Sequence, residues 1–133
     1  NNFPVAVLIL DIDFFKKIND TYSHAVGDSV LSQLGTYLLG TKRTYDLVCR
    51  WGGEEFVVAI LLDKEDKPIQ AAERLRQQAH RIKIDGATET VKLSGGLVIM
   101  QENENIDSAI KRADTMLYKA KESGRNRIMT DIA

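Results

Sequence analysis

The pattern of apolar residues along the chain predicts four strands. Val5 to Leu10 is a continuous apolar run, which is typical of a central strand covered on both faces. Further strands are expected at Leu47–Trp51, Phe56–Leu62 and Thr90–Met100. Two adjacent glycines, Gly95 and Gly96, interrupt the last of these and indicate a bulge or a close approach of another backbone.

Three helices are predicted from apolar residues that recur at intervals of three and four. The first is introduced by Gly27-Asp28 and ends near Gly40, the second follows a charged loop over 63–68, and the third stops at Gly124. Their apolar positions are Val30, Leu31, Leu34 and Leu38, then Ile69, Ala72, Leu75, Ala79 and Ile82, then Ile106, Ala109, Ile110, Ala113, Met116, Leu117 and Ala120. Strands alternating with single helices predict an α/β sandwich.

A tight hairpin is expected at Arg50–Phe56, where Gly52 and Gly53 tolerate the positive φ that a two-residue turn requires. This turn presents two carboxylates, and an ordinary solvated turn is the alternative interpretation. Asp11 ends the first apolar run, at the end of a strand, where sites on α/β sheets tend to gather. If the two strands are neighbours, Asp11 and Glu54 can meet.

Composition narrows the class of protein. A chain of 133 residues fits one domain, and its net charge of −1, with cations spread along the chain, favours neither nucleic acid nor a membrane surface as a partner. Cys49 is the only cysteine, which excludes an internal disulfide and suits the cytoplasm, and we expect it to be buried in its strand. The apolar runs are too short to span a bilayer. Because the chain starts at Asn1, we expect its natural start to be missing.

Four ordered motifs resemble the GGDEF domain family, most of whose members are diguanylate cyclases that condense two GTP into cyclic di-GMP. The motifs are Asp11–Asp20, His24–Asp28, Gly52–Phe56 and Lys121–Asn126. Glu54 stands where the family name has Asp, a variant that also occurs among active members, and Ser23 replaces the usual glycine before the histidine. The resemblance implies a mixed, mainly antiparallel sheet flanked by helices, similar to the palm of nucleotide cyclases and polymerases. It also implies that residues 1–133 are the C-terminal domain of a longer signalling protein.

Joining nucleoside triphosphates requires neutralisation of charge on the attacking and leaving oxygens, which Mg²⁺ (or Mn²⁺) does through carboxylates and phosphate oxygens. Asp11 and Glu54 are the expected metal ligands. By resemblance the backbone carbonyl of Ile12 joins them, Glu54 is also the catalytic proton acceptor, and Glu55 assists a second metal. The alternatives are a strand-end cap for Asp11 and a solvated tip for Glu54. Asp13 is interpreted as structural.

Five residues are candidates for binding the phosphates of GTP. Phe14 and Phe15 can present backbone N–H groups where the chain turns helical, and their rings are expected to fill the core. Lys16 adds a charge for the terminal phosphate. Lys121 and Arg125 match the family's triphosphate cations, although helix C-terminal cations are the commoner interpretation.

Asn19 and Asp28 are the candidates for reading the base. Guanine offers two adjacent donors that one carboxylate can accept together, and the family uses both positions to hold it. The alternatives are a turn at Asn19-Asp20 and a helix N-cap at Asp28. His24 is interpreted as a packing or hydrogen-bonding residue.

The tetrapeptide Arg43–Asp46 has an Arg-x-x-Asp pattern whose Asp46 is separated from Gly52 by five residues, the family spacing of an inhibitory cyclic di-GMP site. Arginine binds phosphate through two parallel bonds or stacks on guanine, and aspartate accepts from the guanine edge. Arg74 or Arg76 can supply a second arginine, and Arg74 is our choice. A local ion pair is the alternative.

The sequence is therefore interpreted as a metal-dependent diguanylate cyclase with product inhibition. Each domain would bind one GTP, so that a homodimer is needed for the two half-sites to face each other. The alternatives are a catalytically silent receptor for cyclic di-GMP and another nucleotidyl cyclase on the same architecture.

Overall fold

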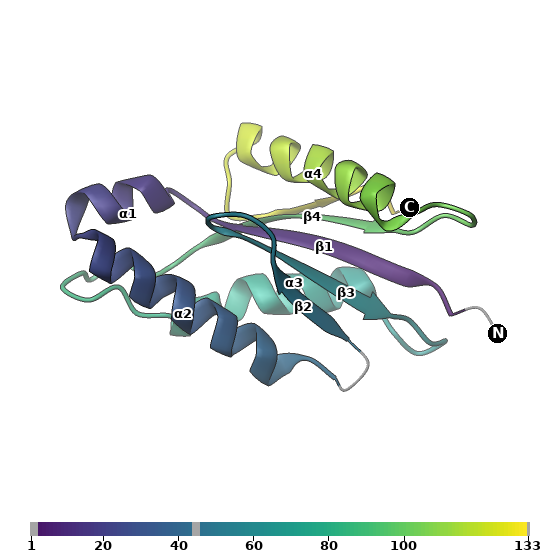
Figure 1. Ribbon diagram of the computed structural model, residues 1–133, viewed down its shortest axis with the longest axis horizontal. Helices are drawn as coiled ribbons and strands as arrows, with labels where there is room; N and C mark the ends of the chain where they lie inside the picture. Colours follow the sequence, from purple (N-terminus) through teal and green to yellow (C-terminus); the bar gives the residue numbers. More distant parts are fainter. Residues whose placement is uncertain (1–2, 44–45, 133) are drawn as a thin grey trace.

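The computed structural model describes residues 3–43 and 46–132, which form one five-stranded sheet with helices on both faces (Figure 1). The strand order is β2-β3-β1-β4-β5. The three pairings that involve β1 or β3 are antiparallel, and β4 pairs with β5 in parallel. The strands are β1 Val5–Ile12, β2 Leu47–Arg50, β3 Glu55–Leu61, β4 Leu93–Ile99 and β5 Ile128–Thr130. The mixed, mainly antiparallel sheet is confirmed.

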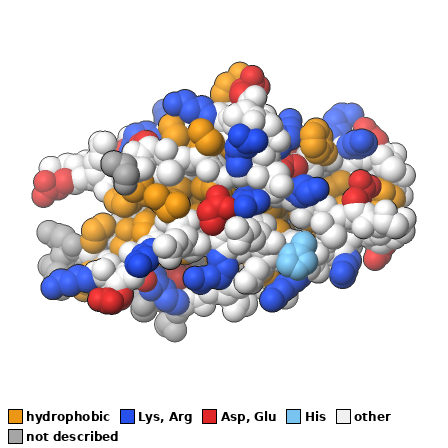
Figure 2. Space-filling model, turned by 180° about the vertical axis from the view of Figure 1, so that it is seen from behind, with side chains coloured by type: hydrophobic (Ala, Val, Ile, Leu, Met, Phe, Trp, Pro, Cys, Tyr) orange, Lys and Arg blue, Asp and Glu red, His pale blue; other side chains and the backbone are white. Residues whose placement is uncertain are grey.

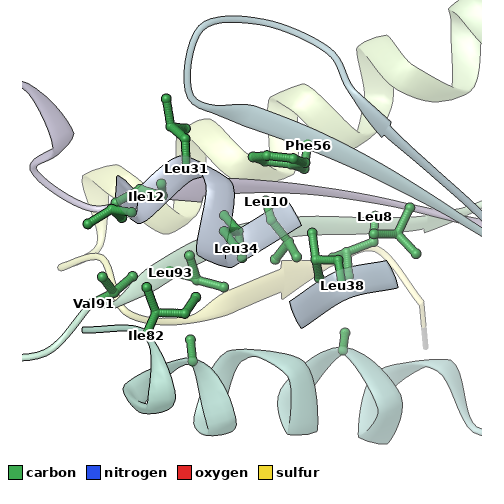
Figure 3. Packing of buried hydrophobic residues seen from close by; sticks show 14 of the residues in the cluster. Leu8, Leu10, Ile12, Leu31, Leu34, Leu38, Phe56, Ile82, Val91 and Leu93 are labelled. Carbon is green, nitrogen blue, oxygen red and sulfur yellow. The ribbon is translucent and has the colours of Figure 1, made fainter. Parts of the chain in front are cut away.

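Alternate residues of the central strand face two separate cores. Leu8 and Leu10 of β1 face the layer formed by α2 and α3, where Leu34 of α2 and Phe56 of β3 meet them (Figure 3). Ile9 faces the opposite layer, formed by α4. Both faces of β1 are thus buried, which explains its uninterrupted apolar sequence.

The helices are α1 Phe15–Thr21, α2 His24–Thr41, α3 Pro68–Gln78, which continues into a 3-10 turn at Ala79–Arg81, and α4 Ile106–Glu122. The helix α1 was not predicted as a separate element. The prediction that Gly27-Asp28 introduces the first expected helix, which is α2 in the structure, was wrong, because Ser23 caps α2 and its Oγ accepts from Val26 N at 3.1 Å. The N-cap interpretation of Asp28 is wrong for the same reason.

The β2–β3 hairpin exists, but its turn differs from the predicted one. Neither Gly52 nor Gly53 has a positive φ, and the strands are joined by four residues, 51–54, instead of a two-residue turn. Arg50 stabilises this loop, since its Nη2 donates to Gly53 O at 2.6 Å and its Nε to Gly52 O at 3.3 Å. The longer loop carries Glu54 to the end of β1.

Gly96 allows α4 to lie close to the sheet. A Cβ at Gly96 would overlap the carbonyl oxygen of Ala113 in α4, so the predicted close approach is confirmed. The register of β4 against β1 is continuous, so there is no bulge. The strand is shorter than predicted, because Thr90 forms only an isolated bridge with Lys83.

The surface shows two further outcomes. Cys49 is exposed, contrary to expectation, because β2 is an edge strand and α4 packs against β1, β4 and β5. Figure 2 shows cationic and anionic side chains interspersed over one face instead of gathered into a single positive patch. None of the helices described, over 3–43 and 46–132, is long and apolar enough to cross a membrane.

Candidate active site

The C-terminal ends of β1 and α4 and the loop between β2 and β3 lie together at one end of the strands (Figure 1). Asp11 pairs in register with Glu55, which places the Asp11 and Glu54 carboxyl groups next to each other, as the sequence predicted. Lys121 reaches the same point from the last turn of α4, where its Nζ donates to Asp11 Oδ2 at 2.6 Å. The site therefore combines residues that lie far apart in the sequence.

Asp11 is 2% exposed, and its second oxygen, Oδ1, has no hydrogen-bond partner among the groups that the structure describes while Glu54 is ionised. Burial raises the pKa of Glu54 to about 7, with further contributions from a hydrogen bond that the protonated carboxyl donates to Asp11 and from the Asp11 charge. Lys121 opposes this shift. The Asp11–Glu54 pair thus carries more negative charge than its surroundings neutralise.

These two carboxyl groups fit a divalent cation. In the described part of the chain, no group of three or more His, Cys, Asp or Glu side chains is arranged to hold a metal. Mg²⁺, however, commonly uses only one or two carboxylates and takes its other ligands from water and substrate phosphates. Such a cation would give the unpartnered Asp11 Oδ1 a partner and would stabilise the ionised form of Glu54, whose pKa is raised.

Glu55 lies on the side of the hairpin that faces α4. It lines a depression of about 380 Å³ together with Trp51 and Asp114. Burial raises its pKa, and the charges of Asp11 and Asp114 add to the shift. A role for Glu55 in holding a second metal stays a prediction.

The predicted phosphate-binding residues surround one depression of about 440 Å³ beside Glu54. Its lining includes Ile12, Phe14, Phe15, Lys16, Glu54, Lys121 and Arg125. The cations enter from three elements, since Lys16 lies on α1, Lys121 on α4 and Arg125 after α4. Lys16 forms an exposed ion pair with Asp20 at 3.0 Å, a contact that an exposed chain can exchange at little cost. The depression therefore brings cations from three elements beside the Glu54 carboxyl group.

Phe14 turns the chain from β1 into α1. Its φ of 56° and ψ of 37° are left-handed, and its ring is 60% exposed, so the expectation that it fills the core was wrong. The guanidinium of Arg125 instead lies over the ring, 4.6 Å from its centroid. Phe15 is buried as predicted, and the N–H groups of this first helical turn have no acceptor within the helix.

Asn19 and Asp28 both lie where α1 packs against α2. The side chain of Asn19 lies against the backbone of Gly27, where a Cβ would overlap its Oδ1, and Asp28 follows directly. Asn19 lies within α1, so the alternative of a turn there is wrong, and Asp28 is exposed in α2. Neither lines the depression beside Glu54, so this pair forms a separate polar position next to it.

Arg43, Asp46 and Arg74 line another depression, of about 270 Å³, between α2, β3 and α3. Arg43 binds buried Asp46 through Nε and Nη2, each at 3.2 Å, and Asp66 through Nη1 at 2.8 Å. Thr44 and Tyr45, the middle of the predicted motif, lie outside the described residues. Asp46 is also held by the backbone N–H of Arg43 at 3.0 Å.

The structure places Arg74, and not Arg76, beside Arg43. Arg76 points to another part of the molecule, where its Nη2 donates to Glu73 at 2.7 Å and its Nη1 to Asn126 Oδ1 at 3.0 Å. Arg74 is exposed and forms no ion pair with any described residue. The sequence left this choice open, because both arginines follow the same helical pattern.

A buried network beside the site was missed from the sequence. Asp13 accepts from Ser94 Oγ at 2.5 Å and from Asn126 N at 2.9 Å, and burial raises its pKa. This agrees with its interpretation as structural. The resemblance of the Lys121–Asn126 motif implied phosphate binding by Arg125, but the contacts of Asn126 with Arg76 and Ser94 join segments that no local pattern connects.

Known proteins share both the sequence and the fold. The family model described as "Diguanylate cyclase, GGDEF domain" matches residues 1–127. Diguanylate cyclase DgcM from Escherichia coli is 41% identical over 124 residues, which cover 93% of this chain and 30% of that protein. The chain thus spans under a third of the length of this relative.

Two solved structures have the same architecture. The GGDEF domain of DgcB from Caulobacter crescentus, in complex with c-di-GMP, has a TM-score of 0.87 and 28% identity, covering 96% of this chain and 78% of that one. The active GGEEF domain of a diguanylate cyclase from Vibrio cholerae also has a TM-score of 0.87, with 30% identity and coverage of 98% and 85%. With the family model matching nearly its whole length, the chain belongs to the GGDEF family of diguanylate cyclase domains.

Proposed function

We propose that the chain condenses two GTP into cyclic di-GMP and two pyrophosphates, with Mg²⁺ or Mn²⁺ as cofactor. The observation that carries this proposal is the Asp11–Glu54 carboxyl pair at the edge of a depression lined by Lys16, Lys121 and Arg125. A triphosphate supplies the anionic groups that these cations bind. With the triphosphate bound in this way, the Asp11–Glu54 pair would lie near the α-phosphate, where the attacking 3′-hydroxyl of the second GTP must lose its proton.

Asp11, Glu54 and the backbone carbonyl of Ile12 are the proposed metal ligands, with Glu55 as an assisting group. When bound, the metal would neutralise negative charge on the reacting phosphate oxygens. Glu54 is the proposed proton acceptor, since a pKa of about 7 suits general-base work near neutral pH. Lys121, now bound to Asp11, can exchange that contact for the triphosphate.

Asn19 and Asp28 are proposed to hold guanine. The Asp28 carboxylate accepts from guanine N1–H and the exocyclic amine together, a pair of donors that adenine lacks. The position next to the phosphate depression leaves the base at the α1–α2 junction, with the phosphates over Phe14, Phe15 and Lys16. This arrangement supports selection of GTP over ATP.

One domain provides half of the reaction centre. A GTP held by its own guanine and phosphate positions cannot attack its own α-phosphate to form the product, so two loaded domains must face each other. The catalytic form is therefore proposed to be a homodimer. We also propose that the chain is one domain of a longer cytoplasmic signalling protein, with neither nucleic acid nor membrane as a direct partner of this domain.

Cyclic di-GMP is also proposed as an inhibitor that binds at Arg43, Asp46 and Arg74. All three guanidinium nitrogens of Arg43 already donate, to Asp46, Asp66 and Leu61 O. A phosphate would therefore have to displace one of these contacts to bind the edge of this guanidinium. Exposed Arg74 is the stronger candidate for the phosphate, because binding there breaks no described ion pair.

The experiment that tests the proposed function is incubation of the chain with GTP and Mg²⁺, followed by chromatography and mass analysis of the products. Cyclic di-GMP and pyrophosphate in a ratio of one to two are expected. Binding of cyclic di-GMP without any turnover of GTP at high protein concentration would favour the receptor alternative. Turnover of ATP instead of GTP would favour another nucleotidyl cyclase.

A further inference from the structure

The segment that carries Arg125 has an unusual backbone. Gly124, Arg125 and Asn126 have consecutive φ values of 123°, 63° and 49°, and two of the three are not glycine. A left-handed backbone is unfavourable for a residue other than glycine and persists where the surroundings fix it. The contacts around this segment must therefore hold it in place.

Hydrogen bonds from the sheet and from α4 fix the backbone. Arg125 N donates to Ala120 O at 2.8 Å, at the end of α4. Asn126 N donates to Asp13 Oδ2 at 2.9 Å and also to Ser94 Oγ at 3.1 Å. Asp13 and Ser94 are both buried, so they provide a rigid support beside the Asp11 end of β1.

Arg76 holds the same segment from a third direction, by reaching it from α3. Its Nη1 donates to Asn126 Oδ1 at 3.0 Å and approaches Asn126 O at 3.4 Å. Its Nε and Nη2 both donate to Glu73 Oε1, at 2.9 and 2.7 Å, and its side chain is 17% exposed. Glu73 thus fixes the guanidinium plane, and the guanidinium fixes the Asn126 side chain.

The side chain of Arg125 is not restrained by packing alone. It lines the depression of about 440 Å³ beside Glu54 and also a second one, of about 490 Å³, on the side of Lys92 and Tyr22. Its guanidinium lies over the Phe14 ring, 4.6 Å from the centroid, and its Nη1 lies 3.9 Å from Asp13 Oδ1. Its direction therefore depends on the backbone of the loop that carries it.

We propose that Arg76 is a positioning residue, which orders Asn126 and so aims Arg125 at the triphosphate. The inference rests on the proposed function, which assigns Arg125 to the triphosphate. Arg76 itself does not line the depression beside Glu54. Its removal should weaken phosphate binding by releasing Arg125, while the guanine position and the carboxyl pair stay unchanged.

The test is a double-mutant cycle of Arg76→Ala and Arg125→Ala. Affinity is measured by calorimetry for GMP and for a GTP analogue with a methylene group between the α- and β-phosphates, which cannot be condensed. Immobilising one long side chain costs about 0.5–1.5 kcal/mol, so Arg76→Ala should weaken binding of the analogue by about two- to tenfold. Binding of GMP should change less, and the double variant should bind the analogue no worse than Arg125→Ala alone.

Arg81→Ala is the matched control, because it removes the same charge from an exposed position that follows α3. Arg76→Lys keeps one donor and should recover part of the affinity. If Arg76→Ala fails to fold, Asn126→Gly removes the Oδ1 acceptor, tolerates the left-handed backbone and enters the same cycle with Arg125→Ala.

The outcomes separate the inference from the proposed function. If the losses of Arg76→Ala and Arg125→Ala add independently, or if analogue binding is unchanged, Arg76 does not act through Arg125 and the inference is overturned. If the parent binds the analogue no better than GMP, the triphosphate site itself is wrong. A loss in analogue binding that disappears in the Arg125→Ala background supports the positioning role.

Discussion

Lys121 Nζ lies 2.6 Å from Asp11 Oδ2, a contact between residues 110 positions apart in the chain. The ammonium group compensates one oxygen of a buried carboxylate, and the other oxygen is unpartnered among the described groups. Glu54 adds a second carboxyl group to the same place. A single lysine against two carboxyl groups leaves a net negative site beside a depression lined by cations.

The first prediction concerns competition between protons and metal at Glu54. Its folded-state pKa of about 7 is above the ordinary value of 4.5, so without metal its contribution to stability falls as pH rises from about 4.5 to about 7. Mg²⁺ must displace that proton, so we expect Mg²⁺ to raise the Tm more at pH 8 than at pH 6. At a concentration 100 times its Kd, the metal would add about 2.7 kcal/mol.

Calorimetric melting with and without Mg²⁺ at both pH values checks this. Glu54→Gln is the control, because it keeps the side-chain shape and removes the titrating group. An equal increase in Tm at pH 6 and pH 8, or an unchanged response in Glu54→Gln, would show that the metal does not bind at this pair.

The second prediction is that Asp28→Asn erodes the preference for GTP over ATP. The amide cannot accept from both guanine donors, and a bidentate base contact contributes about 1–3 kcal/mol of discrimination. Competitive binding of the two triphosphates should show a preference reduced by roughly 5- to 150-fold. The same ratio in Asp28→Asn and the parent would leave Asp28 as an ordinary exposed residue of α2.

The third prediction is that turnover per domain depends on protein concentration. Two loaded domains must meet, so the specific rate of cyclic di-GMP formation should rise with concentration in the dilute range. Fusion to a dimeric coiled coil should remove that rise. Specific activity that stays constant on dilution, with sedimentation showing a monomer, would contradict the shared reaction centre.

The fourth prediction is that Arg74→Ala relieves inhibition by cyclic di-GMP. Arg74 lines the depression formed around Arg43 and Asp46. Arg76, on the same helix, instead contacts Asn126. Progress curves with added cyclic di-GMP should show inhibition weakened by tenfold or more, since a hydrogen bond to a charged group contributes about 1.5–3 kcal/mol. Gln77→Ala, an exposed change on the same helix, is the control.

Inhibition of Arg74→Ala as strong as that of the parent would remove Arg74 from this site. A parallel measurement on Arg43→Ala then distinguishes the two remaining interpretations. Weakened inhibition in Arg43→Ala alone assigns the contact to Arg43, whereas no change in either variant leaves Arg43 and Asp46 as a structural ion pair.

Local sequence patterns predicted the elements well where burial determines them. The run from Val5 to Leu10 is a strand covered on both faces, and Gly96 permits the close approach of α4. The position of Asp11 beside Glu54 was predicted on the condition that the two strands are neighbours, because Asp11 ends one expected strand and Glu54 lies in the turn that leads into the other.

The errors arose where tertiary contacts override local propensity. Gly52 and Gly53 allow positive φ, but Arg50 stabilises a longer loop that does not need it. Cys49 follows two apolar residues, Leu47 and Val48, yet it lies on an edge strand that α4 does not cover. Phe14 looked like a core residue, but the turn into α1 directs its ring outward under Arg125.

The central claim is that the Asp11–Glu54 pair forms the catalytic centre for joining two GTP. The most direct measurement is the rate of cyclic di-GMP formation from GTP and Mg²⁺ by the parent and by Glu54→Gln, at equal concentration and with folding verified by circular dichroism. We predict turnover by the parent and a loss of at least a hundredfold in Glu54→Gln, the lower range for removal of a positioned acid–base group. Near-normal synthesis by a well-folded Glu54→Gln protein would contradict the account.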